Sequence, residues 1–137
     1  MALVIDASVA VGWFVPAQAT ALTDAALTAV SEAGGVAPPH FAIEVLRVLR
    51  RCERRGHMPL KAISASLREL ENLGLAIDEA DPISRLAEIH RLSQRTSLAV
   101  ADAAYLDVAA RSNIPLATRD SALARAAQSI GVPLFQP

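Results

Sequence analysis

The sequence has little of several features that mark particular classes of protein. Cys52 is the only cysteine, which excludes a disulfide framework and a thiolate metal cluster. No apolar run approaches the length of a membrane span, and the first residues lack the basic region of a secretory signal. Lys61 is the only lysine among 13 basic residues. We therefore expect a cytoplasmic protein with no membrane partner.

The composition is that of a globular protein. The 137 residues are 53% hydrophobic and 20% charged, which suits one domain with a single core. We therefore expect a single domain over residues 1–137. The net charge of −1 provides no overall field for nucleic acid, so any such binding must use a local basic patch.

Short apolar runs alternate with helical patterns along the chain. Strands are predicted near residues 3–5, 36–37, 75–77, 114–118 and 132–135. A short helix or a turn is predicted near residues 9–15, and helices are predicted near residues 20–32, 40–55, 59–73, 81–95, 100–112 and 121–130. Strands that alternate with helices predict a mostly parallel sheet between layers of helices. The expected fold class is α/β, with three layers (α/β/α) and a central sheet of four to five strands.

Two acids lie at or just after the ends of predicted strands. Asp6 ends the apolar run at residues 3–5, and Asp120 follows the strand candidate at 114–118. In open α/β sheets the working crevice lies beyond the carboxyl ends of the strands, so both side chains are well placed for chemistry. Each could equally cap the helix that follows, and for Asp120 taken alone the cap is the favoured interpretation.

Two further acids lie on predicted helices. Asp102 lies in a segment that is apolar almost all round, with no basic residue one turn away. A buried carboxylate costs several kcal/mol, roughly, unless it is protonated, paired or bound to a metal. For Asp102 we favour a metal over a distant arginine or the Tyr105 hydroxyl. Glu44 borders the apolar stripe of its helix, and a pair with Arg47 at i+3 explains it equally well.

Other acids have ordinary explanations. Asp81 precedes Pro82, as an N-cap does at the start of a helix. Asp107 is followed four residues later by Arg111, the favourable order for an ion pair on a helix.

Taken together, Asp6, Glu44, Asp102 and Asp120 suggest one site. Clustered carboxylates without histidine or cysteine suit hard cations such as Mg²⁺ or Mn²⁺. Such ions can ionise a water molecule and stabilise the departing oxygen in phosphodiester cleavage. His40 lies one turn before Glu44, where a supporting role in the site stays open.

The helix that carries Glu44 also presents a basic face. This face consists of Arg47, Arg50, Arg51, Arg54 and Arg55, offset only by Glu53. It could bind backbone phosphates or an acidic partner. An ordinary solvated face, favoured near the C-terminus by the helix dipole, is an even alternative.

Four short segments carry the four acids in a suggestive order. They are Val-Ile-Asp-Ala-Ser at 4–8, Glu-Val-Leu-Arg-Val-Leu at 44–49, Ala-Asp-Ala-Ala-Tyr-Leu at 101–106 and Leu-Ala-Thr-Arg-Asp at 116–120. In this order and at these separations they resemble the PIN-domain nucleases, and in particular the VapC-type toxins of bacterial toxin–antitoxin pairs. The similarity spans nearly the whole chain. Each segment is degenerate, and it is the set of four that is specific.

The resemblance implies a PIN-like fold and a ribonuclease that cleaves structured RNA with Mg²⁺ or Mn²⁺. It implies that the catalytic and metal-binding residues are Asp6, Glu44, Asp102 and Asp120. Ser8 and Thr118 would help to shape the site. From the basic face described above, we expect Arg47, Arg50, Arg51 and Arg54 to contact RNA or antitoxin. The resemblance also implies a homodimer and a cognate antitoxin protein that occupies the site.

The chain departs from the family pattern at two places. Arg47 stands where the family often has asparagine, and Ala17-Gln18-Ala19 replaces acidic residues that often follow the first helix. Neither change removes an expected metal ligand.

Other site classes fit less well. A phosphoacceptor receiver domain needs a lysine near the site, but Lys61 lies inside a predicted helix. A haloacid-dehalogenase-type phosphatase needs an aspartate where Ser8 stands, and a dinucleotide site needs a glycine-rich loop that residues 7–10 lack. Two alternatives stay open: an RNA-processing PIN nuclease without an antitoxin, and an inert PIN-like scaffold that binds protein. Retention of all four acids speaks against the scaffold.

Overall fold

The computed structural model describes residues 2–137. The strands are β1 (Leu3–Ile5), β2 (Gly35–Ala37), β3 (Ala76–Ile77) and β4 (Leu116–Ala117). The helices are α1 (Ala7–Phe14), the short 3₁₀ helix η1 (Pro16–Gln18), α2 (Ala21–Ala33), α3 (Phe41–Arg54), α4 (Leu60–Asn72), α5 (Pro82–Thr96), α6 (Val100–Ser112) and α7 (Ser121–Ser129).

The four strands form one parallel sheet in the order β3-β2-β1-β4. This confirms the predicted α/β class with a four-stranded sheet. The predicted fifth strand at 132–135 is wrong, because that segment makes only an isolated parallel bridge between Leu134 and Leu116. Pro133 has no N–H group to donate to a ladder, which prevents a longer pairing there.

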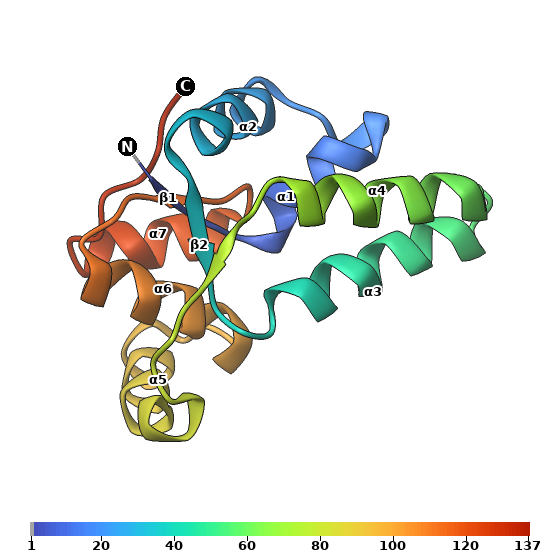
Figure 1. The fold of residues 1–137 in the computed structure, drawn as a ribbon. Helices are drawn as coiled ribbons and strands as arrows, with labels where there is room; N and C mark the ends of the chain where they lie inside the picture. The colour runs from blue at the N-terminus through green and yellow to red at the C-terminus, as the bar shows by residue number, and fades with distance from the viewer. Residues whose placement is uncertain (1) are drawn as a thin grey trace.

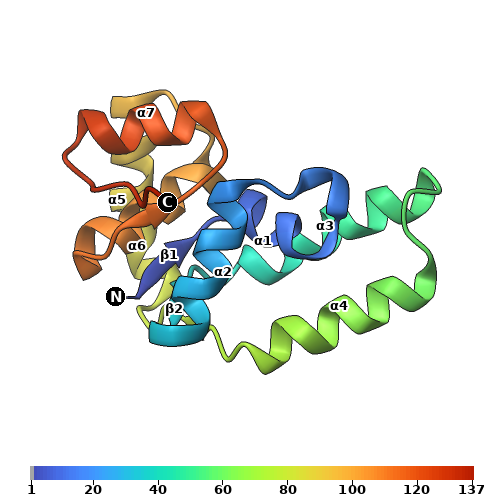
Figure 2. The ribbon, with the colours of Figure 1, turned by 90° about the horizontal axis from the view of Figure 1, so that it is seen from above.

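The helices gather on two sides of the sheet. Helices α5, α6 and α7 lie together on one side, and α1 to α4 lie on the other (Figures 1 and 2). The hairpin of α3 and α4 projects away from the sheet in both views. None of the helices described for residues 2–137 combines the length and apolarity needed to span a bilayer.

The core forms around β1, as its unbroken apolar run predicts. Leu3, Val4 and Ile5 are at most 1% exposed, because helices cover both faces of a parallel sheet. Helix α3 buries Phe41 and Leu49 on its apolar stripe against this core.

Helices α1 and α2 pack unusually closely at Gly12. A Cβ atom on Gly12 would lie 2.5 Å from Cγ2 of Thr23. Thr23 also forms a capping box with Thr20 at the start of α2, and its carbonyl oxygen accepts a hydrogen bond from Trp13 Nε1 at 2.8 Å. The glycine therefore allows α1, which begins directly after Asp6, to lie against the start of α2.

Candidate active site

The acids predicted to form a site come from different elements that share one edge of the sheet. Because all four strands are parallel, their carboxyl ends meet at the same edge. Asp6 follows β1, and Asp120 lies between β4 and α7. Glu44 lies in the first turn of α3 and Asp102 in the first turn of α6. The site thus depends on the tertiary fold.

Two hydroxyl groups hold Asp6 in place. Ser8 Oγ and Thr118 Oγ1 each donate to Asp6 Oδ2 at 2.7 Å. Each hydroxyl in turn accepts a backbone N–H at 3.0 Å, Ser8 from Arg119 and Thr118 from Asp120. Since the backbone groups supply their own protons, the hydroxyl protons are free to point at Asp6. This arrangement joins the end of β1 to the loop after β4.

Asp6 is 6% exposed, and its surroundings act on its pKa in opposite directions. Burial has the largest effect and raises the pKa, and the negative charge of Glu44 raises it further. The two hydroxyl donors lower it. Asp6 occupies the N-cap position of α1, but its side chain makes no cap hydrogen bond. The capping explanation for Asp6 is therefore wrong.

Asp120, in contrast, is a true N-cap. Its Oδ1 atom accepts the N–H groups of Ala122 at 2.8 Å and Leu123 at 3.1 Å. The same residue acts electrostatically on the site, because its charge raises the pKa of Asp102. The two explanations considered for Asp120 are thus compatible.

Asp102 has no hydrogen bond or ion pair within residues 2–137. It is half-buried rather than fully buried as its apolar helix had indicated. Burial raises its pKa most, followed by the charges of Asp120, Asp6 and Glu44, while His40 lowers it. Asp102 therefore lies close enough to each of the other three acids for their charges to act on it.

Glu44 is oriented by α6 and by its own helix. The Tyr105 hydroxyl donates to Glu44 Oε1 at 2.6 Å, so Tyr105 serves Glu44 and is not the partner of Asp102. Burial and this hydrogen bond raise the pKa of Tyr105, which keeps the donor proton in place. His40 Nε2 lies 3.3 Å from the same oxygen and 2.9 Å from the Ala101 carbonyl oxygen. Because both neighbours are acceptors, Nε2 is assigned the hydrogen.

Arg47 lies on the other side of the Glu44 carboxylate. Its Nη2 atom is 3.8 Å from Glu44 Oε2, and its side chain is 67% exposed. The i+3 pair considered from the sequence is therefore present, at a distance typical of a loose surface contact.

The donor set fits a divalent oxygen-binding cation. Among residues 2–137 no three acidic, histidine or cysteine side chains are already arranged as a metal cage. Carboxylate oxygens are nevertheless the ligands that Mg²⁺ and Mn²⁺ prefer. Burial, and after it the charges of neighbouring acids, raise the pKa values of Asp6 and Asp102, and a bound cation would favour the charged form of both carboxylates. The residues that would hold it are Asp6, Glu44, Asp102 and Asp120.

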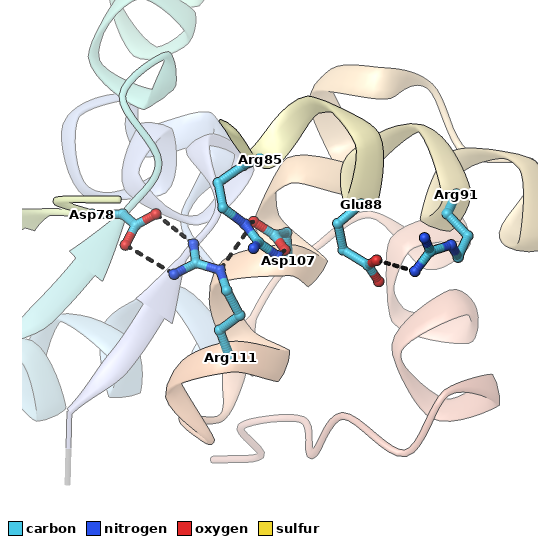
Figure 3. Close-up of polar contacts among 6 residues, drawn as sticks. All are labelled: Asp78, Arg85, Glu88, Arg91, Asp107 and Arg111. Atoms are coloured by element: carbon cyan, nitrogen blue, oxygen red, sulfur yellow. Dashed lines mark hydrogen bonds and ion pairs between the residues drawn. The ribbon is translucent and has the colours of Figure 1, made fainter. Parts of the chain in front are cut away.

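A separate ion-pair network anchors helix α6, which carries Asp102. Asp107 is 2% exposed and accepts two hydrogen bonds from Arg85, at 2.6 and 3.1 Å. Arg111 donates to Asp107 at 3.1 Å and also pairs with Asp78, just after β3. Figure 3 shows the four side chains converging from α5, α6 and the β3 end. The network fixes the far end of α6 relative to the sheet.

Sequence reasoning did not find this network. It assigned Asp107 an ordinary pair with Arg111, which is present, but missed Arg85 and Asp78. The sequence did contain one indication of it. Asp107 lies on the same apolar helix as Asp102, so its carboxylate was expected to be buried, and a buried charge needs more partners than the single exposed Arg111.

The comparisons with known proteins agree with this geometry. Residues 3–129 match the family model described as PIN domain. Two Mycobacterium tuberculosis proteins, from strains CDC 1551 / Oshkosh and ATCC 25618 / H37Rv, are both named Ribonuclease VapC3. Each is 34% identical over 94 residues, which cover 66% of this chain and 63% of the relative. The similarity thus spans less than two thirds of these curated relatives.

A solved structure supports the fold. The crystal structure of PAE2754 from Pyrobaculum aerophilum superposes with a TM-score of 0.71 at 21% identity. The match covers 92% of this chain and 84% of that one. At this identity the likeness concerns the fold alone, whereas the family model covers nearly the whole sequence. The chain belongs to the PIN domain family.

Proposed function

We propose that this protein is a metal-dependent endoribonuclease that acts as the toxin of a toxin–antitoxin module. The observation that carries the proposal is the convergence of Asp6, Glu44, Asp102 and Asp120 at one edge of the sheet. Asp102 is central, because this carboxylate has no partner among residues 2–137 and a raised pKa. The relatives named Ribonuclease VapC3 support the same activity.

Each acid has a distinct part in the proposed mechanism. Ser8 and Thr118 hold Asp6, and Tyr105 holds Glu44, so these two carboxylates are oriented before a cation binds. Asp102 and Asp120 add further negative charge to the site. When bound, Mg²⁺ or Mn²⁺ would supply an activated water molecule and neutralise charge on the departing oxygen.

The other expected features follow from the family. We infer that residues 1–137 act as one nuclease domain, that the protein works in the cytoplasm as a homodimer, and that a cognate antitoxin protein inhibits it. An RNA-processing nuclease without an antitoxin is the main alternative. A small adjacent gene in the same operon would favour the toxin over that alternative.

A titration of Mn²⁺ into the purified protein, with RNA cleavage assayed on the same sample, tests the proposal. The wild type should bind Mn²⁺ and produce discrete RNA fragments, and Asp102→Asn should lose both. Asp24→Asn is the matched control, because Asp24 is an exposed acid in the first turn of α2. It should retain both activities.

Two results would contradict the proposal. Unchanged binding and cleavage in Asp102→Asn would remove the acid from the site. A folded wild type that neither binds Mn²⁺ nor cleaves RNA would favour the inert scaffold.

A further inference from the structure

One face of α3 continues from the carboxylate site towards the tip of the α3–α4 hairpin. With 3.6 residues per turn, Arg51 and Arg55 each lie about 20° round the helix from Glu44, and Arg47 about 60°. Arg50 lies about 120° away. We call Arg47, Arg51 and Arg55 the arginine track. All three are exposed.

The guanidinium groups of the arginine track form almost no ion pairs. Arg47 has only the 3.8 Å contact with Glu44, and Arg51 and Arg55 make no ion pair within residues 2–137. Arg50 differs, because its Nη1 atom lies 2.6 Å from Glu53 Oε1. The basic face predicted from sequence therefore contains arginines that are available for a ligand and one that is already paired.

The direction of the track indicates what it would bind. It starts beside Glu44, where the proposed reaction places a phosphodiester group, and extends about 16 Å along the helix to Arg55. The hairpin that carries it projects away from the sheet in Figures 1 and 2. A chain of phosphates that leaves the site along α3 would meet one guanidinium group on each turn.

We infer that the arginine track binds the sugar–phosphate backbone of an RNA strand next to the cleavage site, with Arg47 nearest to the cleaved bond. This inference rests on the proposed ribonuclease function. Guanidinium groups bind phosphates through paired hydrogen bonds. The track contains no aromatic side chain for base stacking, so it contacts the backbone and positions the strand without reading its sequence.

The test measures binding of a short fluorescein-labelled single-stranded RNA by anisotropy. EDTA is present so that no metal-dependent cleavage occurs, and the salt concentration is varied. Arg47→Ala and Arg51→Ala should each weaken binding several-fold and reduce the slope of log K against log[salt] by about 0.7. Arg91→Ala, the matched control at an exposed arginine of α5 that pairs with Glu88, should leave affinity and slope close to those of the wild type.

Three results would overturn the inference. The first is an equal loss of RNA affinity in all three variants, which would indicate that the overall charge of the protein binds RNA without a defined path. The second is unchanged RNA affinity in Arg47→Ala and Arg51→Ala. The third is the absence of RNA binding by the wild type. Cleavage of the same RNA with Mn²⁺ separates the two proposals. If the wild type cleaves the RNA and the Arg47 and Arg51 variants cleave it equally well, the RNA-binding role of the arginine track is refuted and the ribonuclease proposal stands. If RNA binding depends on Arg47 and Arg51 but no variant or wild type cleaves the RNA, the ribonuclease proposal is refuted and RNA binding by the arginine track stands.

Discussion

Neutralising Asp107 tests how strongly the buried network holds the fold. In Asp107→Asn, Arg85 and Arg111 would face a neutral amide of the same shape. Removing one charge from a buried ion pair costs about 3–5 kcal/mol. Arg85 and Arg111 are 27% and 28% exposed, so both can turn partly to water, and Arg111 keeps its pair with Asp78. We therefore expect a loss near the lower limit, about 3 kcal/mol.

Glu88→Gln is the matched control, since it neutralises an acid in a nearby ion pair on α5, the helix that carries Arg85. Figure 3 shows this pair of Glu88 and Arg91 beside the network. The two side chains are 35% and 71% exposed, and exposed pairs contribute less than about 1 kcal/mol. Glu88→Gln should therefore change stability little.

Urea unfolding followed by circular dichroism measures both variants. With an m value of about 2 kcal/mol/M, Asp107→Asn should lower the midpoint by about 1.5 M. Thermal unfolding should show a fall in Tm of about 10 °C. If the Asp107 and Glu88 variants differed by less than about 1 kcal/mol, the network would contribute no more than a surface ion pair.

Two further predictions concern the site and its neighbouring helices. Burial and the neighbouring acids raise the pKa of Asp102 in the folded state, so its charge costs stability only above about pH 4. In the absence of metal, the free energy of unfolding of Asp102→Asn in urea should therefore equal that of the wild type at pH 3 and exceed it by about 0.5–1 kcal/mol at pH 7. Excess Mn²⁺ should reverse this difference, because it stabilises the wild type by binding. A variant less stable than the wild type at pH 7 without metal would contradict the reasoning. Gly12→Ala should lower stability by about 1–3 kcal/mol, because the new Cβ would clash with Thr23. Adding Thr23→Ser removes the nearest clashing methyl and should restore part of the loss in thermal unfolding, because Cβ of residue 23 at 2.9 Å and the Gln18 carbonyl oxygen at 3.0 Å still crowd the new atom. No rescue would argue against the clash.

Much of the fold could be predicted because its signals are local. Helix α6 lies at Val100–Ser112, as its apolar pattern and flanking residues indicated. Asp81 accepts the N–H of Ile83 as an N-cap. The strands were harder, because β3 and β4 have two residues each and depend on pairing with distant neighbours.

The site showed the same division between local and distant information. Asp102 stood out because its own helix offers it no partner. Asp107 did not, because Arg111 satisfied the local rule four residues away, whereas Arg85 is 22 positions away on another helix. The donation from Tyr105 to Glu44 spans 61 positions, and no periodicity in the sequence encodes such a contact.

The hydrogen bond from Thr118 to Asp6 has a consequence for the synthesis of this protein. It joins residues 112 positions apart, and β1 pairs with β4 over the same separation. Asp6 leaves the ribosome early, but Thr118 and Asp120 must emerge before Asp6 is held and the acids are complete. Contacts of such long range also form slowly. Under the proposed ribonuclease function, this late assembly would leave unfinished chains without a complete site while they are still attached to the ribosome.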